Sequence, residues 1–144
     1  MNKILSVLLL FAVLACGRDS SVTLEFRPAQ MQPSAGLTEM HVRETGETFY
    51  LHDEAPITNA DIDTAFVGFM NGEIMVDLRF TETGSEEFAR LTETNVGKHI
   101  GIIVGGELLS VPRVNAPITE GRAIINGRFT YEEASRIAAF ICRK

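Results

Sequence analysis

Alternating apolar and polar residues flank a dipeptide that favours a tight turn. Residues 66–70 and 73–80 lie on either side of Asn71-Gly72, which is the strongest short signal for a two-residue β-hairpin because both central positions need positive φ. The register set by this turn pairs Phe69 with Ile74 and Val67 with Val76. The same register places Leu78 and Phe80 on one apolar face. Met75, Asp77 and Arg79 lie on the opposite face.

A second hairpin is predicted around Gly105-Gly106. Residues 100–104 and 108–111 are apolar on both sides of this turn, and a two-residue connection would pair Ile102 with Leu109 and Ile100 with Val111. Shorter alternating segments predict four more strands, at residues 22–26, 40–43, 48–51 and 122–126. Residues 27–38 contain Pro28, Pro33, Ser34 and Gly36 and are interpreted as a loop.

Three capping patterns predict helices. Thr58 with Asp61 opens a brief helix that carries Ile62, Ala65 and Phe66 on one face. The box Thr83-Gly84-Ser85-Glu86 opens a second helix with Phe88, Leu91 and Thr92 inward, and Gly97 ends it. Thr130 with Glu133 opens the third, where Phe129 packs against Ala134 and the buried stripe is Ala134, Ile137, Ala138 and Ile141. The expected fold is α+β: a two-layer sandwich of a mostly antiparallel sheet of hairpins with about three helices packed on it.

The first residues are typical of an export signal. Lys3 precedes an apolar run over residues 4–15 that only Ser6 interrupts, and twelve helical residues span about 18 Å, too short for a bilayer core of about 30 Å. The run ends in Val13-Leu14-Ala15-Cys16-Gly17, which resembles the lipobox of bacterial lipoproteins. The resemblance implies a signal peptide at residues 1–15, lipid attachment at Cys16, a lipidated tether over 16–21 and a domain over 22–144.

Two details qualify this interpretation. The alternative is an ordinary secretory peptide cut nearby, which would leave Cys16 as a free thiol. Gly17 stands where enterobacterial lipoproteins retained in the inner membrane carry Asp, so the resemblance favours the outer membrane, on the side that faces the periplasm.

Composition and motifs exclude several classes of function. The 144 residues carry 13 basic and 19 acidic side chains, a net charge of -6, which does not suit a nucleic acid partner. The two cysteines and three histidines show no metal-ligand spacing, and no motif for a cofactor or catalytic nucleophile occurs. No metal and no cofactor is therefore expected.

Several polar groups were weighed as sites and interpreted as structural. The pairs Glu86-Glu87 and Glu132-Glu133 fall in predicted first helical turns, where they complement the helix dipole. His52-Asp53-Glu54 is interpreted as a solvated loop. Cys142 lies beside the stripe of the last helix, either as a buried inert thiol or as an exposed thiol available for pairing with another molecule.

From Gly72 onward the sequence resembles the head part of the first periplasmic domain of SecD, an accessory subunit of the bacterial protein-export channel. The most specific block runs over residues 86–138 and carries these matches: Phe88, Leu91-Thr92, Asn95, Gly97-Lys98, Gly106, Ser110, Pro112, Ile118, Gly121, Ile125, Gly127-Arg128-Phe129-Thr130, Glu133-Ala134 and Ala138. Gly105-Gly106 replaces the Asp-Gly usual in SecD. Each match also has a role in folding, and Thr92, Asn95 and Ser110 are expected to cap and stabilise turns rather than bind a ligand.

The resemblance implies protein binding without catalysis. The transmembrane helices that couple proton flow to export in SecD have no counterpart here, so energy coupling is not carried over. The leading hypothesis is a non-enzymatic envelope lipoprotein whose domain binds unfolded or exported chains, or an envelope partner. The alternatives are an inhibitor or immunity-type lipoprotein that binds one dedicated periplasmic enzyme, and an enzyme of unrecognised type.

Overall fold

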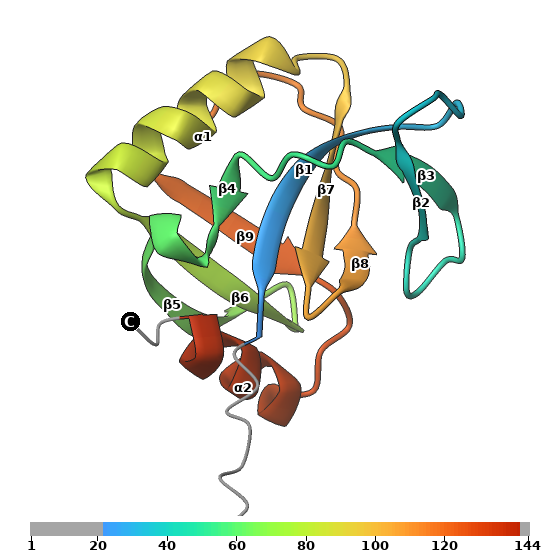
Figure 1. Cartoon of the computed structure of the whole chain (residues 1–144). Helices are drawn as coiled ribbons and strands as arrows, with labels where there is room; N and C mark the ends of the chain where they lie inside the picture. The colour runs from blue at the N-terminus through green and yellow to red at the C-terminus, as the bar shows by residue number, and fades with distance from the viewer. Residues whose placement is uncertain (1–21, 142–144) are drawn as a thin grey trace, which may run out of the picture.

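The computed structural model describes residues 22–141, which form two antiparallel sheets and two helices (Figure 1). The first sheet has the order β2-β3-β1-β7-β8, with β4 also paired to β1, and the second has the order β5-β6-β9. In chain order the elements are β1 (Leu24–Gln30), β2 (Thr38–His41), β3 (Thr48–Leu51), β4 (Ile57–Thr58), a 3₁₀ turn (Asn59–Asp61), β5 (Ile62–Met70), β6 (Glu73–Phe80), α1 (Glu82–Thr94), β7 (His99–Val104), β8 (Glu107–Ser110), β9 (Arg122–Asn126) and α2 (Tyr131–Ile141). The α+β class and the antiparallel pairing are confirmed, although the strands divide into two sheets.

The main core lies between the two sheets and the helices. Its most deeply buried members come from both sheets and from α2: Leu24, Ile57, Val76, Leu78, Ile125 and Ala134. Figure 1 shows α1 and α2 at opposite ends of the sheets, with α2 packed against β5 and β6. Burial of these aliphatic side chains, at about 25 cal/mol per Å² of apolar surface, is the main term that stabilises the fold.

Strand β1 is longer than the sequence pattern indicated. The predicted loop over 27–38 begins only after Gln30, because β1 pairs with β7 as far as Ala29 and with β3 at Ala29 and Gln30. Pro28 lies inside the strand, where its carbonyl oxygen accepts a hydrogen bond from the backbone N–H of His52 at 3.0 Å. The two neighbouring strands outweigh the turn-forming tendency of proline here.

The helix predicted after Thr58 is wrong. The capping box exists, since the Thr58 backbone N–H donates to Asp61 Oδ2 at 2.9 Å, but it caps one 3₁₀ turn. From Ile62 the chain enters β5, which pairs with β6 along its whole length. Local capping cannot outweigh a nine-residue strand pairing. The structure therefore has two helices and one turn where about three helices were predicted.

The other two helices form where they were predicted, with one change of cap. Thr81, not Thr83, caps α1: its Oγ1 accepts the Gly84 N–H at 3.0 Å, so Glu86-Glu87 falls in the second turn rather than the first. At α2 the predicted box is complete, because Thr130 N–H donates to Glu133 Oε2 at 3.2 Å and Glu133 N–H donates to Thr130 Oγ1 at 3.1 Å. The inward residues predicted for both helices are buried or packed against the core.

The two predicted hairpins differ in accuracy. At Asn71-Gly72 both turn residues have positive φ, 52° and 80°, and the predicted pairs form, including Val67 with Val76. Asp77, however, is 2% exposed, so the outer face is not simply solvated. At Gly105-Gly106 a register shift lies between Ile102 and Ile103 and pairs Ile102 with Ser110 rather than Leu109.

A smaller second core supports the β2–β3 hairpin on the other face of the first sheet. It consists of Ala29, Val42, Phe49, Leu51, Ile103 and Leu108. Arg43 ties this region to the start of α2: its Nη2 donates to the Gly127 carbonyl oxygen at 3.0 Å, and its guanidinium lies 5.6 Å from the ring centre of Phe129. The hairpin is thereby fixed to the rest of the domain.

Candidate functional site: an apolar groove

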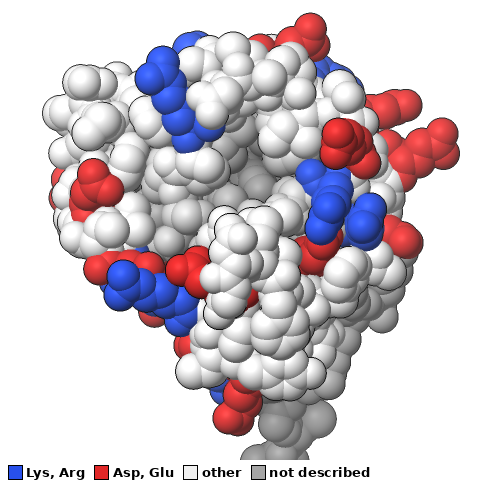
Figure 2. All heavy atoms as spheres, turned by 180° about the vertical axis from the view of Figure 1, so that it is seen from behind, with Lys and Arg blue, Asp and Glu red and all other residues white. Residues whose placement is uncertain are grey.

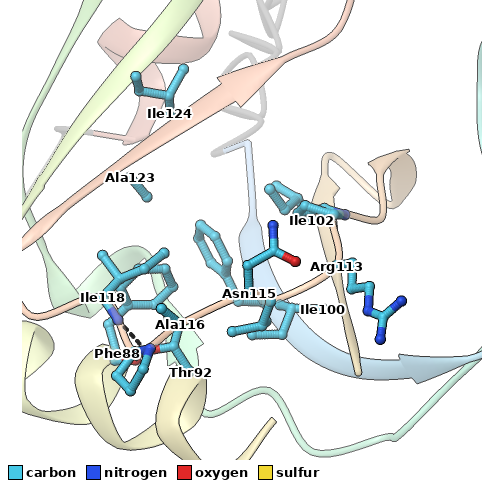
Figure 3. A pocket seen from close by; sticks show the side chains of 14 residues that line it. Phe88, Thr92, Ile100, Ile102, Arg113, Asn115, Ala116, Ile118, Ala123 and Ile124 are labelled. Atoms are coloured by element: carbon cyan, nitrogen blue, oxygen red, sulfur yellow. Dashed lines mark hydrogen bonds between the residues drawn. The ribbon is translucent and has the colours of Figure 1, made fainter. Parts of the chain in front are cut away.

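An apolar groove of about 420 Å³ opens where the two sheets diverge (Figure 3). Its walls come from β7, β9, α1 and the irregular segment 111–121. The side chains that define it are mostly aliphatic or aromatic: Phe26, Phe88, Ile100, Ile102, Ile118 and Ile124. Pockets of about 300–1,000 Å³ with such a lining are typical binding sites.

The floor of the groove is rigid. Phe26 and Phe88 are 1% and 4% exposed, and their rings meet edge to face with centroids 5.4 Å apart. The ring of Phe80 stacks on the ring of Phe88, with their centroids 4.5 Å apart. A floor that belongs to the main core keeps its shape when the groove is empty.

The wall formed by segment 111–121 is held by backbone hydrogen bonds. The Ile118 N–H donates to Thr92 Oγ1 at 2.9 Å, the bond drawn in Figure 3, while the Thr92 hydroxyl itself donates back to the Phe88 carbonyl oxygen at 2.9 Å. Val114 is tied to the turn after α1, since the Gly97 N–H donates to its carbonyl oxygen at 2.7 Å. Between these anchors Ala116 and Pro117 are exposed and form the rim.

Strand β9 forms the opposite wall and has a free edge. It is the terminal strand of the second sheet and pairs only with β6 among the described residues. Ala123 and Ile124 of this strand line the groove. An apolar groove therefore lies beside unpaired strand backbone, an arrangement that can accept an added strand.

One arginine lines the groove, and a second belongs to β9. Arg113 lines the groove, and Arg122 immediately precedes Ala123; Figure 2 shows basic side chains on either side of a hollow. Arg122 Nε donates to both carboxylate oxygens of the buried Asp77 at 3.0 Å. This hydrogen bonding and the charge of Asp77 raise the pKa of Arg122 above its ordinary value.

The groove has the chemistry of a binding surface. Among the described residues that line it, the polar side chains are Thr92, whose hydroxyl is already bonded, Arg113 and Asn115. Over residues 22–141 no group of three or more His, Cys, Asp or Glu side chains could hold a metal ion. Within the same range no helix is long and apolar enough to cross a membrane.

The structure places most of the polar residues considered in the sequence analysis in helix ends, strands or loops. Asn95 Nδ2 donates to the Leu91 carbonyl oxygen at 2.8 Å at the end of α1, and Ser110 lies in β8 opposite Ile102. Asp53 accepts the Thr38 hydroxyl at 2.7 Å on an exposed loop. Thr92 both stabilises α1 and anchors the groove wall. Cys16 and Cys142 lie outside the described residues.

The sequence did not predict the groove. Its one local signal is a loop between two predicted strands, in which Pro112 and Pro117 flank a mixed apolar and polar segment and Ile118 follows. Phe26 and Phe88 reach its floor from elements 62 residues apart (88 − 26). Only the packing of the sheets brings them together.

The fold and the groove define a small two-sheet α+β domain with an apolar groove between the sheets. The family described as SecDF, P1 head subdomain, matches residues 34–142, and the chain belongs to this family.

Named relatives and solved structures agree with this assignment. The chain is 40% identical to the protein translocase subunit SecD of Rickettsia bellii (strain RML369-C) over 81 residues, 56% of this chain and 16% of that protein. It is 36% identical to SecD of Dictyoglomus turgidum (strain DSM 6724 / Z-1310) over 99 residues, 68% of this chain and 23% of that protein. It thus spans less than a quarter of these relatives.

Two solved structures of SecDF share the fold. The crystal structure of SecDF in its super-membrane-facing form matches 85% of this chain and 19% of that chain, with a TM-score of 0.68 and 26% identity. A structure of the membrane component SecDF that enhances protein export matches 85% of this chain and 62% of that chain, with a TM-score of 0.69 and 24% identity.

Proposed function

We propose that this chain is a non-catalytic cell-envelope lipoprotein whose groove binds extended apolar segments of exported protein chains. The observation that carries the proposal is the groove itself: an apolar hollow with a rigid floor beside the free edge of β9. Its relatives are named as subunits of a protein translocase. One of the related structures is titled as a component that enhances protein export.

The geometry favours an extended segment over a small molecule. A segment laid along β9 would satisfy the free backbone groups of that strand, and alternate side chains would enter the groove near Ile118 and Ile124. Main-chain pairing does not depend on sequence, whereas the apolar lining selects hydrophobic segments. Both properties suit chains that have not yet folded.

Binding without chemistry agrees with the side chains present. The lining holds no carboxylate, histidine or thiol, so it offers no general acid, base or strong nucleophile. The comparisons give no support to the alternative of an inhibitor of one dedicated enzyme.

The proposal includes an anchor at Cys16. Signal cleavage after residue 15 and lipidation of Cys16 would hold the domain on a membrane surface that faces the periplasm, with the outer membrane favoured by Gly17. Two or three acyl chains give stable attachment, whereas one is marginal. The groove would then meet chains that emerge from the export channel.

In-cell photocrosslinking tests the groove directly. A photoreactive phenylalanine analogue replaces Ala116 on the rim, and a matched variant carries it at the exposed Glu86 of α1, which does not line the groove. We expect crosslinks to newly exported chains from the Ala116 variant only. Equal crosslinking from both positions, or none from either, contradicts the proposal.

A binding assay measures the contribution of the apolar wall. Ile118→Asp changes a side chain that is 39% exposed, and Val96→Asp is the control at a side chain 46% exposed outside the groove. Affinity for a fluorescent, reduced and carboxymethylated unfolded protein should fall about tenfold for Ile118→Asp, about 1.4 kcal/mol, and less than about twofold for Val96→Asp. Equal affinities in the two variants would count against the groove.

The anchor has its own test. Metabolic labelling with an alkyne analogue of palmitate should mark the wild-type protein and not Cys16→Ser, and the wild type should fractionate with membranes. Labelling retained in Cys16→Ser, or absent from the wild type, rejects the anchor without affecting the groove.

A further inference from the structure

An exposed apolar patch surrounds the tip of the β5–β6 hairpin. It consists of Phe66, Phe69, Met70 and Tyr131, which are 45%, 67%, 43% and 59% exposed. We call these four residues the tip patch. Single exposed apolar side chains are common, but four large ones around one turn mark a contact surface.

The tip patch presents apolar side chains on both faces of the hairpin. Phe69 stacks on Tyr131 of α2, with ring centres 6.3 Å apart and an angle of 13° between the planes. Because side chains alternate along a strand, Phe66 and Met70 point to the opposite face from Phe69. The tip is therefore an apolar wedge supported by α2, which packs against β5.

The described chain begins at the same end of the molecule. The Val22 carbonyl oxygen accepts a hydrogen bond from Asn59 Nδ2 at 3.0 Å, and Val22 lines a small pocket together with Ile137 of α2. Ile137 follows Tyr131 by six residues, about 9 Å along a helix. Figure 1 shows the blue start of β1 beside α2.

The length of chain before Val22 limits how far this end can lie from a lipid anchor. Val22 is six positions after Cys16 in the sequence (22 − 16), and six fully extended residue steps reach about 20 Å. A domain held this closely meets the bilayer surface at a high effective concentration. The nearest large apolar surface at this end is the tip patch.

We propose that the tip patch docks on the lipid surface to which Cys16 is anchored and so fixes the orientation of the domain. This inference rests on the proposed anchor. Aromatic rings and a methionine enter the interface between headgroups and acyl chains, where Tyr131 can keep its hydroxyl in water. Glu73 and Glu132 adjoin the patch, so the surface it fits is zwitterionic rather than anionic.

Docking at this end would direct the groove away from the membrane. The groove lies against α1, and α1 is at the opposite end of the sheets from α2 (Figure 1). In Figure 2, which shows the hollow, the area below it is largely uncharged. The domain would therefore hold the groove open toward the periplasm.

The absence of tryptophan from the sequence allows a clean fluorescence test. Residues 16–144 with Cys142→Ser are coupled through the Cys16 thiol to a maleimide lipid in phosphatidylcholine vesicles. Phe69→Trp reports on the tip patch. Met31→Trp is the matched control, because Met31 is 55% exposed and lies just beyond the far end of β1, roughly 20 Å from Leu24.

Brominated lipid should quench the Phe69→Trp indole at least about threefold more than the Met31→Trp indole, with a blue shift only for the former. Adding Phe66→Ser, Met70→Ser and Tyr131→Ser should abolish that difference, and circular dichroism should confirm that the fold persists. Equal quenching at the two positions overturns the proposal. A blue shift that depends on protein concentration in the absence of vesicles also overturns it, since it would identify a second copy as the occupant.

Because the protein is attached to the vesicle through a maleimide lipid, this test is independent of the test of the proposed anchor. The maleimide lipid replaces any native lipid, so the quenching result does not depend on whether cells modify Cys16. Absence of palmitate labelling from the wild-type protein would reject the anchor alone, and equal quenching of the coupled protein would reject docking alone.

Discussion

The two sheets differ in how their faces are covered. The first sheet packs against the main core on one face and against the second core on the other, so that every residue of β7 from Ile100 to Val104 is buried. The second sheet has a core on its inner face only. On its outer face, side chains of the sheet's own strands shield one another. The Met75 side chain lies over Gly68, and the Asp77 carboxylate lies beneath the guanidinium of Arg122.

This difference places the candidate surfaces. The second sheet leaves the edge of β9 and the tip of the β5–β6 hairpin exposed. The tip patch belongs to this half-covered sheet, and its strand β9 forms one wall of the groove opposite β7 of the first sheet. Four substitutions, two of them with a matched control, test how far the two sheets differ in the stability that a changed side chain costs.

The largest effect is expected where the sheets share one core. Leu78 of β6 is 0% exposed within the main core, and Leu78→Ala should destabilise the whole domain by about 2–5 kcal/mol because it removes buried methyl groups and leaves a cavity. Urea unfolding followed by circular dichroism measures the change. A loss of unfolding free energy below about 1 kcal/mol would mean that neighbouring side chains repack into the cavity.

A smaller effect is expected from a methyl group on the doubly covered sheet. A Cβ at Gly101 would lie 2.7 Å from Leu51 Cδ2 and 3.1 Å from Leu108 Cδ1, and Leu51 is fully buried. Gly101→Ala should cost about 1–3 kcal/mol through overpacking and should speed amide hydrogen exchange in β3.

The matched control for this variant lies on the open face of the second sheet. A Cβ at Gly68 would meet only the flexible end of Met75, with Cε at 3.0 Å, so Gly68→Ala should cost less than Gly101→Ala. Equal losses of unfolding free energy would show that the outer face of the second sheet is packed as tightly as the first sheet.

The next substitution tests the ion pair between Asp77 and Arg122 on the outer face of the second sheet. Asp77→Asn weakens the charged hydrogen bonds to Arg122 and should lower the thermal midpoint, though less than Leu78→Ala, while Glu73→Gln on the same strand should leave it unchanged. The pKa of Arg122 is raised, so its charge stabilises the fold at every pH below the ordinary arginine range and loses this effect only above it. The difference between wild type and Asp77→Asn should therefore stay constant from pH 7 to pH 10.

The smallest effect is expected at the hairpin tip. Phe69 is 67% exposed although it lies on the same strand face as Val67, so Phe69→Ser should change the unfolding free energy by no more than about 0.5 kcal/mol. Urea unfolding in the absence of lipid checks this. A larger loss would indicate that its stacking on Tyr131 supports the fold rather than a contact surface.

Most features that depend on residues close together in the sequence were predicted correctly, whereas features that depend on distant segments were not. The Asn71-Gly72 register and the Thr130–Glu133 box depend on residues within a few positions of each other, and both are confirmed. The segment after Thr58 satisfied a helical pattern as well as a strand pattern, and pairing with β6 decided between them. The β7–β8 hairpin has the predicted turn, but its register shift beyond Ile103 depends on packing over both faces.

The site was less predictable than the fold. Thr92 and Asn95 make helix hydrogen bonds of the kind expected, and Thr92 also anchors a groove wall through Ile118, 26 residues away. No local pattern contains that bond. Asp77 lies on the predicted face, opposite the apolar one, but it is buried beneath Arg122 of β9, which comes 45 residues later in the chain.

The sequence by itself determined the Thr130–Glu133 cap, the hairpin turns, the buried stripes of α1 and α2 and the family, because each is carried by residues close in the chain or by a recurring set of them. The tertiary structure alone decided the division into two sheets, the strand that replaced a helix and the groove between β7 and β9. These depend on pairings between distant segments, whose loop-closure cost and packing gain no local window of sequence contains.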